Sequence, residues 1–140
     1  MTDLEELRTT FEFFDDWEDK YRFVIDLGKE LDDLPDADKT DQNLIHGCQS
    51  QVWFTADHND DGSLHFKLDS DAFIVRGLIG IVLIALNNKP AQDIVEFDMD
   101  ALFTELELIQ HLSQTRGNGL RAMIARIKSV SHAYLNPEPI

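Results

Sequence analysis

The sequence is poor in cysteine and lacks long apolar runs. Its 140 residues include a single cysteine, Cys48. One thiol excludes an internal disulfide, a CxxC pair and a metal site built only from cysteines. The longest apolar run, residues 78–86, has nine residues, far fewer than the roughly 18–20 that span a bilayer. We therefore expect a buried helix in this stretch and no membrane partner.

Basic residues are also scarce. Twelve Lys and Arg stand against 27 Asp and Glu, which gives a formal net charge of −15 and a pI near 4.4. Such an acidic chain repels phosphate backbones, so nucleic acid is not an expected partner. Residues 1–70 carry 6 basic and 19 acidic residues, a net −13, whereas residues 71–140 carry 6 and 8, a net −2. Long-range attraction should favour a basic partner surface that meets the first half of the chain.

The first six residues show neither the basic segment nor the apolar segment of a secretory signal. This predicts a reducing, cytoplasmic location. A length of 140 residues and a mass of 16.0 kDa predict one domain over residues 1–140, because single hydrophobic cores commonly serve about 100–150 residues. The hydrophobic content of 43% is sufficient for such a core.

Apolar residues recur at helical spacing in two stretches near the N-terminus. The first stretch contains Leu4, Leu7, Phe11 and Phe14, and the second contains Trp17, Tyr21, Val24, Ile25, Gly28 and Leu31. These spacings predict two amphipathic helices, each with one buried stripe. Asp15 and Asp16 precede the second helix as N-cap residues, and we expect that helix to end near Asp32.

From residue 51 the apolar period becomes two. Val52, Phe54 and Ala56 alternate with polar residues, a turn follows at residues 59–62, and a second alternating run continues to Leu68. This pattern predicts a β-hairpin.

The chain after the hairpin is expected to be helical. Ser70 and Asp71 supply N-cap chemistry for a buried helix over residues 72–86. Short helices are expected over residues 90–95 and 99–107, and the spacing of apolar residues from 120 to 134 predicts a last helix. Helices on both sides of a central hairpin indicate an α+β domain, with a small antiparallel sheet covered by helices.

Cys48 is the strongest candidate for chemistry. Gly47 before it permits unusual backbone angles, and the polar Gln49 and Ser50 follow it. A reactive thiol must be available as thiolate, which a nearby cation promotes. The same pattern is compatible with a buried, inert cysteine. His46, two residues earlier, allows a further interpretation in which Cys48 and His46 form a nucleophile and base pair of a self-contained thiol enzyme.

Two other sites are conceivable around these residues. A metal site made of Cys48, His46 and an acid matches no known zinc spacing. Arg116 lies between Thr115 and Gly117, in a glycine-rich stretch that we expect to be a turn before the last helix. A cation placed there can face an anion or a thiolate, although an exposed turn arginine is the simpler interpretation.

Several motifs together resemble those of the SufE family of sulfur acceptors. The most specific stretch runs from Gly47 to Trp53 and reads GCQSQVW, with WEDKY at residues 17–21 upstream. The segments at residues 69–78 and 112–123 resemble later family segments in order and approximate spacing. The resemblance covers nearly the whole chain.

This resemblance implies a function that residue patterns alone do not specify. Members of the family dock on a pyridoxal-phosphate cysteine desulfurase, accept its persulfide sulfur, stimulate that enzyme and deliver sulfur to an iron–sulfur scaffold complex. The expected partners are therefore a desulfurase of the SufS or CsdA type and a scaffold resembling SufBCD. Whether this chain acts as SufE or as its CsdE-type paralogue, and whether it forms a homodimer, is left open by the motifs.

The resemblance also assigns roles to residues. Cys48 matches the sulfur acceptor, Gly47, Gln49 and Ser50 would support its loop, and Asp71 and Arg116 match positions associated with the loop and with docking. The implied fold resembles SufE and the IscU scaffolds. No resident cofactor or metal is expected, because the pyridoxal phosphate belongs to the partner and one cysteine cannot supply the several thiolates that usually hold a cluster.

Overall fold

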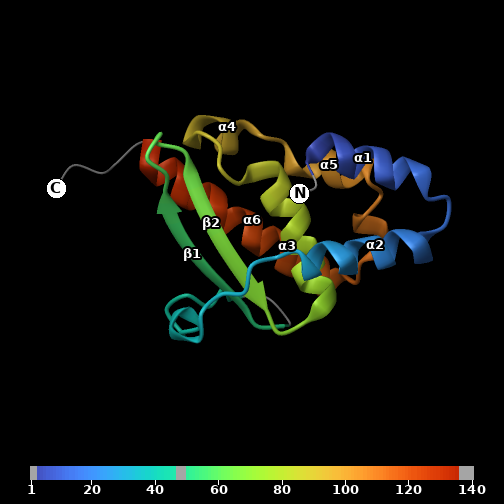
Figure 1. Ribbon diagram of the computed structural model, residues 1–140, viewed down its shortest axis with the longest axis horizontal. Coiled ribbons are helices and arrows are strands. Elements are labelled where there is room, and N and C mark those ends of the chain that lie inside the picture. The colour runs from blue at the N-terminus through green and yellow to red at the C-terminus, as the bar shows by residue number, and fades with distance from the viewer. Residues whose placement is uncertain (1–2, 47–49, 136–140) are drawn as a thin grey trace.

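The computed structural model describes residues 3–46 and 50–135, in which a two-stranded hairpin lies against a group of helices (Figure 1). The elements in chain order are α1 (Leu4–Phe13), α2 (Trp17–Lys29), η1 (Asp36–Asp38), β1 (Val52–His58), β2 (Leu64–Ser70), α3 (Phe73–Leu86), α4 (Ala91–Glu96), α5 (Met99–Glu105), η2 (Ile109–His111) and α6 (Gln114–Leu135). The α+β class expected from the sequence is confirmed.

The first two helices begin at aspartate N-caps. The Asp3 carboxylate accepts a hydrogen bond from the Glu6 N–H at 2.8 Å, and Asp16 accepts one from the Asp19 N–H at 2.9 Å. Each bond satisfies an N–H that has no partner within its helix. Tyr21, which the sequence placed on the buried stripe, is 39% exposed. Its position at the edge of the stripe keeps the phenol in contact with water.

Helices α2 and α3 approach each other at two glycines. A Cβ atom on Gly77 would lie 2.1 Å from the Val24 carbonyl oxygen, and one on Gly28 would lie 2.7 Å from the Gly77 nitrogen. Real Cβ atoms do not come this close to backbone atoms, so only glycine permits the contact. The crossing fixes the start of α3 against the end of α2.

The hairpin and its turn lie where the sequence predicted them. Strands β1 and β2 pair antiparallel from Val52 opposite Ser70 to His58 opposite Leu64. In the turn between them Gly62 adopts a φ of 90°, a region that favours glycine. The Ser63 hydroxyl and N–H donate to the Asp61 carboxylate and lower its pKa.

Both edges of the hairpin are covered by other parts of the chain. On the β1 edge, the Ile45 N–H donates to the Val52 carbonyl at 2.8 Å. On the β2 edge, the Asn87 side chain accepts from the Phe66 N–H at 2.7 Å and donates to the Phe66 carbonyl at 3.2 Å. These contacts satisfy backbone groups that an open edge would leave exposed.

The start of α3 differs from the expectation. The helix begins at Phe73 with Ala72 at the N-cap, and no side chain caps it. Asp71 instead accepts from the Gln51 N–H at 3.2 Å, and Ser70 Oγ accepts from the Ala72 N–H at 3.2 Å. The prediction that Ser70 and Asp71 cap this helix is therefore wrong, because the end of the hairpin competes for their side chains.

The start of α6 also differs. The helix begins at Gln114, so Arg116 lies in its first turn and not in a turn before it. The Ser113 hydroxyl accepts from the Arg116 N–H at 3.2 Å, and the Ser113 carbonyl accepts from the Gly117 N–H at 2.9 Å. This capping outweighs the roughly 1 kcal/mol that a glycine costs within a helix.

The buried apolar side chains form one continuous cluster between the hairpin and the helices. Helix α3 supplies eight side chains to it, and the buried side of α6 includes Leu120, Met123 and Ile127. The short helices predicted near residues 90–95 and 99–107 are present as α4 and α5. Within residues 3–46 and 50–135, no helix combines the length and apolar character required to cross a membrane.

Candidate functional site

The residues on the two sides of the segment that contains Cys48 are bonded to each other. Gly47, Cys48 and Gln49 themselves lie outside the described residues. On their two sides, Ile45 and Val52 are joined by the 2.8 Å backbone bond, and Leu44 bridges to Trp53. The two ends of the candidate acceptor segment are therefore held together at the start of β1.

Asp71 fixes the returning end of this segment. Its carboxylate accepts from the Gln51 N–H, three residues after Cys48, and the neighbouring Ser70 is paired with Val52 across the hairpin. Asp71 is exposed, so its second oxygen remains accessible to water or to a partner. The family resemblance assigned Asp71 to the surroundings of the Cys48 segment. In the structure Asp71 contacts Gln51, which lies three residues after Cys48 in the sequence.

A small pocket of about 20 Å³ opens beside the same segment. Its lining comes from the start of the hairpin and from helices α3 and α6: Ser50, Val52, Val75, Leu78, Thr115, Arg116, Gly119, Leu120 and Met123. A volume of this size holds about one water-sized group. Most of the lining is apolar, so the pocket suits an uncharged or polarizable atom better than a hydrated ion.

Arg116 brings the only side-chain cation to the lining of this pocket among the described residues. It is half-buried in the first turn of α6 and lines the pocket together with Ser50. Within the same described part of the chain, its guanidinium has no carboxylate within ion-pair distance. An arginine in such a place stabilises a nearby anion, and a thiolate is one example. Ser50 and Arg116, both candidates from the sequence, line the same pocket.

The interpretation that pairs His46 with Cys48 involves a residue outside the described ones and stays a hypothesis. His46 is exposed, and no hydrogen bond or ion pair of its imidazole is seen among the described residues. Residues 3–46 and 50–135 contain no cluster of three or more His, Cys, Asp or Glu that could hold a metal ion. Cys48 lies outside these residues.

Asp69 is a structural residue of the site that the sequence reasoning missed. Its side chain is only 2% exposed and pairs with the Arg76 guanidinium. Its other oxygen accepts from the Leu34 N–H at 3.1 Å and lies 3.7 Å from Lys39 Nζ. The sequence gives only a weak sign of this buried ion pair. Asp69 follows directly after the alternating apolar residues of the predicted strand, and a carboxylate that is buried there needs a partner.

Arg76 carries this network to the end of α2. Its guanidinium donates to the Gly28 carbonyl at 3.3 Å and to the Leu31 carbonyl at 3.1 Å, and it lies 3.2 Å from the Asp33 carboxylate. A cation at a helix C-terminus satisfies carbonyls that lack intrahelical partners. Asp69 and Arg76 together fix the end of β2, the start of α3 and the end of α2, the three elements around Asp71.

The upstream WEDKY motif reaches the same region through ring stacking. The Trp17 indole stacks on the His111 imidazole, with centroids 3.9 Å apart and planes 11° from parallel. His111 lies two residues before Ser113, the cap of α6. Stacking thus links the start of α2 to the segment that positions Arg116.

The described residues form a small α+β fold, and comparison with known proteins identifies the family to which the chain belongs. The family model named SufE, an Fe-S metabolism associated domain, matches residues 5–131. An uncharacterized SufE-like protein of Rhizobium meliloti is 45% identical over 138 residues, covering 96% of this chain and 99% of the relative. An uncharacterized SufE-like protein of Rhizobium etli is 44% identical over 131 residues, covering 91% and 88%.

The chain therefore belongs to the SufE family, and with it to the proteins associated with iron–sulfur metabolism. A solved structure supports the fold. The solution structure of a hypothetical protein from Thermus thermophilus superposes with a TM-score of 0.76 at 16% sequence identity, over 94% of this chain and 95% of that one. The family resemblance predicted from the sequence motifs is confirmed.

Proposed function

We propose that this protein is a sulfur acceptor and carrier in iron–sulfur cluster assembly, with Cys48 as the acceptor. Membership of the SufE family, in a chain whose single thiol lies within the family's specific motif, is the observation that carries this proposal. The expected donor is a pyridoxal-phosphate cysteine desulfurase, and the expected recipient is an iron–sulfur scaffold complex. The protein itself holds no resident cofactor in this scheme.

The transfer is a thiol exchange in which atoms and electrons balance. Cys48 loses its proton, and the thiolate attacks the outer sulfur of the persulfide on the desulfurase cysteine. A sulfur–sulfur bond forms on Cys48 while the sulfur–sulfur bond of the donor breaks. The desulfurase cysteine leaves as a thiolate and takes up a proton, so no external oxidant or reductant is required. Removing the persulfide frees the desulfurase for another turnover, which accounts for stimulation of the enzyme.

The described residues around Cys48 suit this exchange. Asp71 and the Ile45–Val52 pair hold the ends of the segment, which limits the conformations that must be ordered for attack. Arg116 supplies a cation that favours the thiolate. The small apolar pocket beside Ser50 offers a place where a sulfur atom is sheltered from other thiols between the two transfers.

The proposal is tested by intact-protein mass spectrometry after incubation with a cysteine desulfurase and cysteine. We expect the wild-type protein to gain the mass of sulfur and to lose it on reduction. Cys48→Ser should gain none, because a hydroxyl at this position is not a nucleophile toward the persulfide at neutral pH. Unchanged circular dichroism of Cys48→Ser would show that folding is intact.

Sulfur on Cys48→Ser would contradict the proposal, as would wild-type protein that takes up none. His46→Ala separates the proposal from the self-contained thiol enzyme. We expect this variant to accept sulfur at the wild-type rate, whereas an enzyme that uses His46 as its base would lose most of its activity.

A further inference from the structure

Helix α3 is buried along nearly its whole length, with one exception at its start. Among its fourteen residues, all of which the structure describes, only Phe73 is exposed, at 78%. Single exposed apolar residues are common on protein surfaces. The position of Phe73 gives this one significance, because it lies two residues after Asp71, which holds the candidate acceptor segment.

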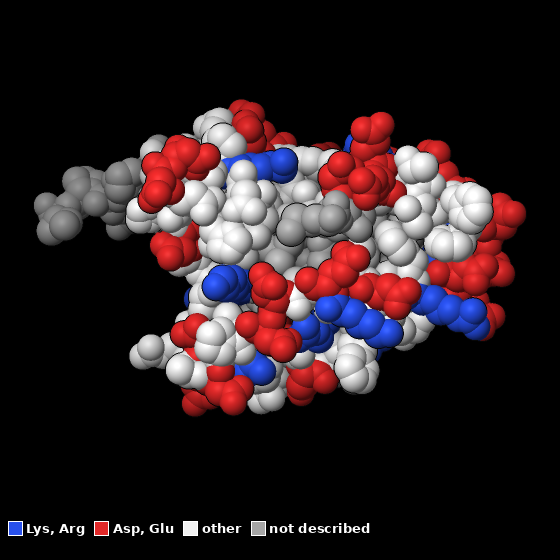
Figure 2. Space-filling model, in the orientation of Figure 1, with Lys and Arg blue, Asp and Glu red and all other residues white. Residues whose placement is uncertain are grey.

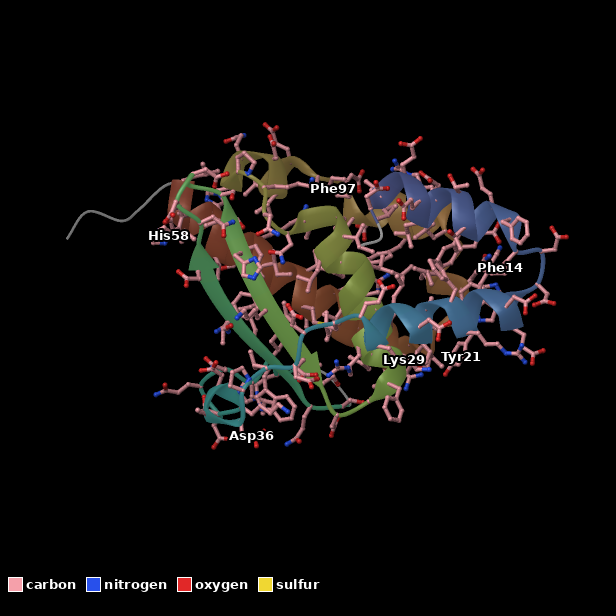
Figure 3. The ribbon with its side chains drawn as sticks, viewed as in Figure 1. Phe14, Tyr21, Lys29, Asp36, His58 and Phe97 are labelled. Carbon is pink, nitrogen blue, oxygen red and sulfur yellow. The ribbon has the colours of Figure 1, made fainter. Side chains whose placement is uncertain are left out.

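Phe73 borders a hollow on the surface of about 370 Å³. The hollow lies between the last turns of α2 and the first turn of α3, and its lining consists of Ile25, Gly28, Lys29, Asp33, Ser70, Asp71, Phe73 and Arg76. Figure 3 labels Lys29 at the end of α2, beside the start of α3. The Gly28–Gly77 contact and the Asp69–Arg76 pair make these walls rigid before any partner binds.

We infer that this hollow and Phe73 form the surface on which the cysteine desulfurase docks, which rests on the proposed sulfur-carrier function. The occupant is a segment of the desulfurase that places an apolar side chain against Phe73 and a Lys or Arg near Asp71. Asp71 is shared by the hollow and the acceptor segment. A segment bound here therefore contacts Asp71, which also holds Gln51, three residues after Cys48 in the sequence.

The charges around the hollow favour a basic occupant. Lys29 is 3.5 Å from the Asp26 carboxylate, and Arg76 is engaged by Asp33 and Asp69. Both cations of the lining are therefore paired with acids, whereas Asp71 is exposed and meets only the Gln51 N–H among the described residues. The first half of the chain has a net charge of −13. A basic partner segment complements both the hollow and its surroundings.

An exposed aromatic ring on rigid backbone is suited to act as a binding anchor. Aromatic residues that enter a desolvated pocket of a partner often dominate the affinity of an interface. Phe73 is held by a helix whose other residues are buried or half-buried, so little backbone order is lost on binding. Its ring gains a dry environment only when a partner covers it.

The chain contains a matched control for this role. Phe13, at the end of α1, is 79% exposed, which is close to the exposure of Phe73, but it lies near the α1–α2 connection and lines neither the hollow nor the small pocket. We expect Phe73→Ala to raise the Kd for the desulfurase about tenfold or more, which is typical for loss of an aromatic anchor. Phe13→Ala should leave the Kd within about twofold. Isothermal titration calorimetry measures both.

A second measurement separates docking from chemistry at the thiol. The rate at which iodoacetamide alkylates Cys48 should be the same in wild type, Phe73→Ala and Phe13→Ala, since neither ring belongs to the acceptor machinery. An unchanged Kd in Phe73→Ala, an equal loss in both variants, or an altered alkylation rate in Phe73→Ala would overturn the docking surface. Wild-type protein that takes up no sulfur would contradict the proposed function itself, whereas transfer that is insensitive to Phe73→Ala contradicts only this inference.

Discussion

Two aspartates only two residues apart have different environments in this protein. Asp69 is buried and paired with Arg76, whereas Asp71 is exposed and accepts one hydrogen bond from the Gln51 N–H. A buried carboxylate that loses its partner, or a buried guanidinium that loses its carboxylate, carries a large desolvation penalty. An exposed carboxylate that loses one hydrogen bond is hydrated by water. The two residues should therefore respond differently to the same substitution.

We expect Asp69→Ala to lower the free energy of unfolding by about 3 kcal/mol or more, because Arg76 would remain largely buried without its main partner. Asp71→Ala should lower it by about 1 kcal/mol or less. Urea unfolding followed by circular dichroism measures both changes, and Asp71→Ala serves as the control for Asp69→Ala. Similar losses in the two variants would show that the buried pair does not stabilise the fold as its geometry indicates.

Candidate residues that stand in short sequence motifs can be found from the sequence, whereas residues whose contacts join distant segments cannot. Cys48, Ser50, Asp71 and Arg116 stand in motifs and could be named as candidates from the sequence, and their roles stay a prediction. Asp69 and Arg76 could not be assigned a role, because Arg76 also contacts Gly28, Leu31 and Asp33, more than 40 residues earlier. A polar network between segments so distant in sequence leaves no periodic signal.

At the scale of elements, hydrophobic spacing predicted the helices and the hairpin, but not every boundary. The expected turn at Arg116 is the first part of α6, since Ser113 caps the helix and the glycines after Arg116 are accommodated within it. The expected end of α2 near Asp32 is at Lys29. Glycine signals a turn in an isolated sequence, whereas in the folded protein it often marks a close approach between elements.

The crossing of α2 and α3 depends on such a close approach. In Gly77→Ala, the new Cβ atom would lie 2.1 Å from the Val24 carbonyl oxygen, so the two helices must separate. We expect this variant to lose about 3 kcal/mol of unfolding free energy, at the upper end of what overpacking usually costs. Thermal unfolding measured by circular dichroism should show a clearly lower Tm.

Gly117→Ala is the matched control for this prediction. Among the described residues, the added Cβ would meet no atom within 4 Å apart from its chain neighbours and the backbone of its own helix, and alanine favours the helical backbone over glycine by up to about 1 kcal/mol. The Tm of Gly117→Ala should therefore equal or exceed that of the wild type. Equal destabilisation in both glycine variants would indicate that helix conformation, and not the contact with α2, determines the effect of Gly77→Ala.

At the scale of the whole molecule, acidic side chains dominate the visible surface. Figure 2 shows them spread over the visible face, from the hairpin side to the α1 and α2 end, with basic side chains in a narrower band. Along the sequence the acidic excess lies mainly in residues 1–70, which have a net charge of −13. The core follows from hydrophobic spacing, whereas this surface charge contributes nothing to packing and instead acts on approaching partners.

The proposed partner docking should therefore depend on salt. If a basic desulfurase surface is attracted by this acidic half, the second-order rate of sulfur transfer should fall about tenfold or more between roughly 0.05 and 0.5 M NaCl, as the Debye length shrinks from about 14 Å to about 4 Å. Alkylation of Cys48 by uncharged iodoacetamide should be independent of salt, which controls for changes at the thiol.

Two double variants test whether the position of the acidic residues matters, or only their number. Each variant removes two negative charges and so changes the net charge from −15 to −13. Glu30→Gln with Asp32→Asn neutralises exposed acids at the end of α2, and Asp100→Asn with Glu107→Gln neutralises exposed acids in and after α5. Steering depends on charges near the docking surface because screening limits their range to about 10 Å. The α2 pair should therefore slow transfer at low salt more than the α5 pair, and equal rates in the two variants would show that the partner senses only the overall charge.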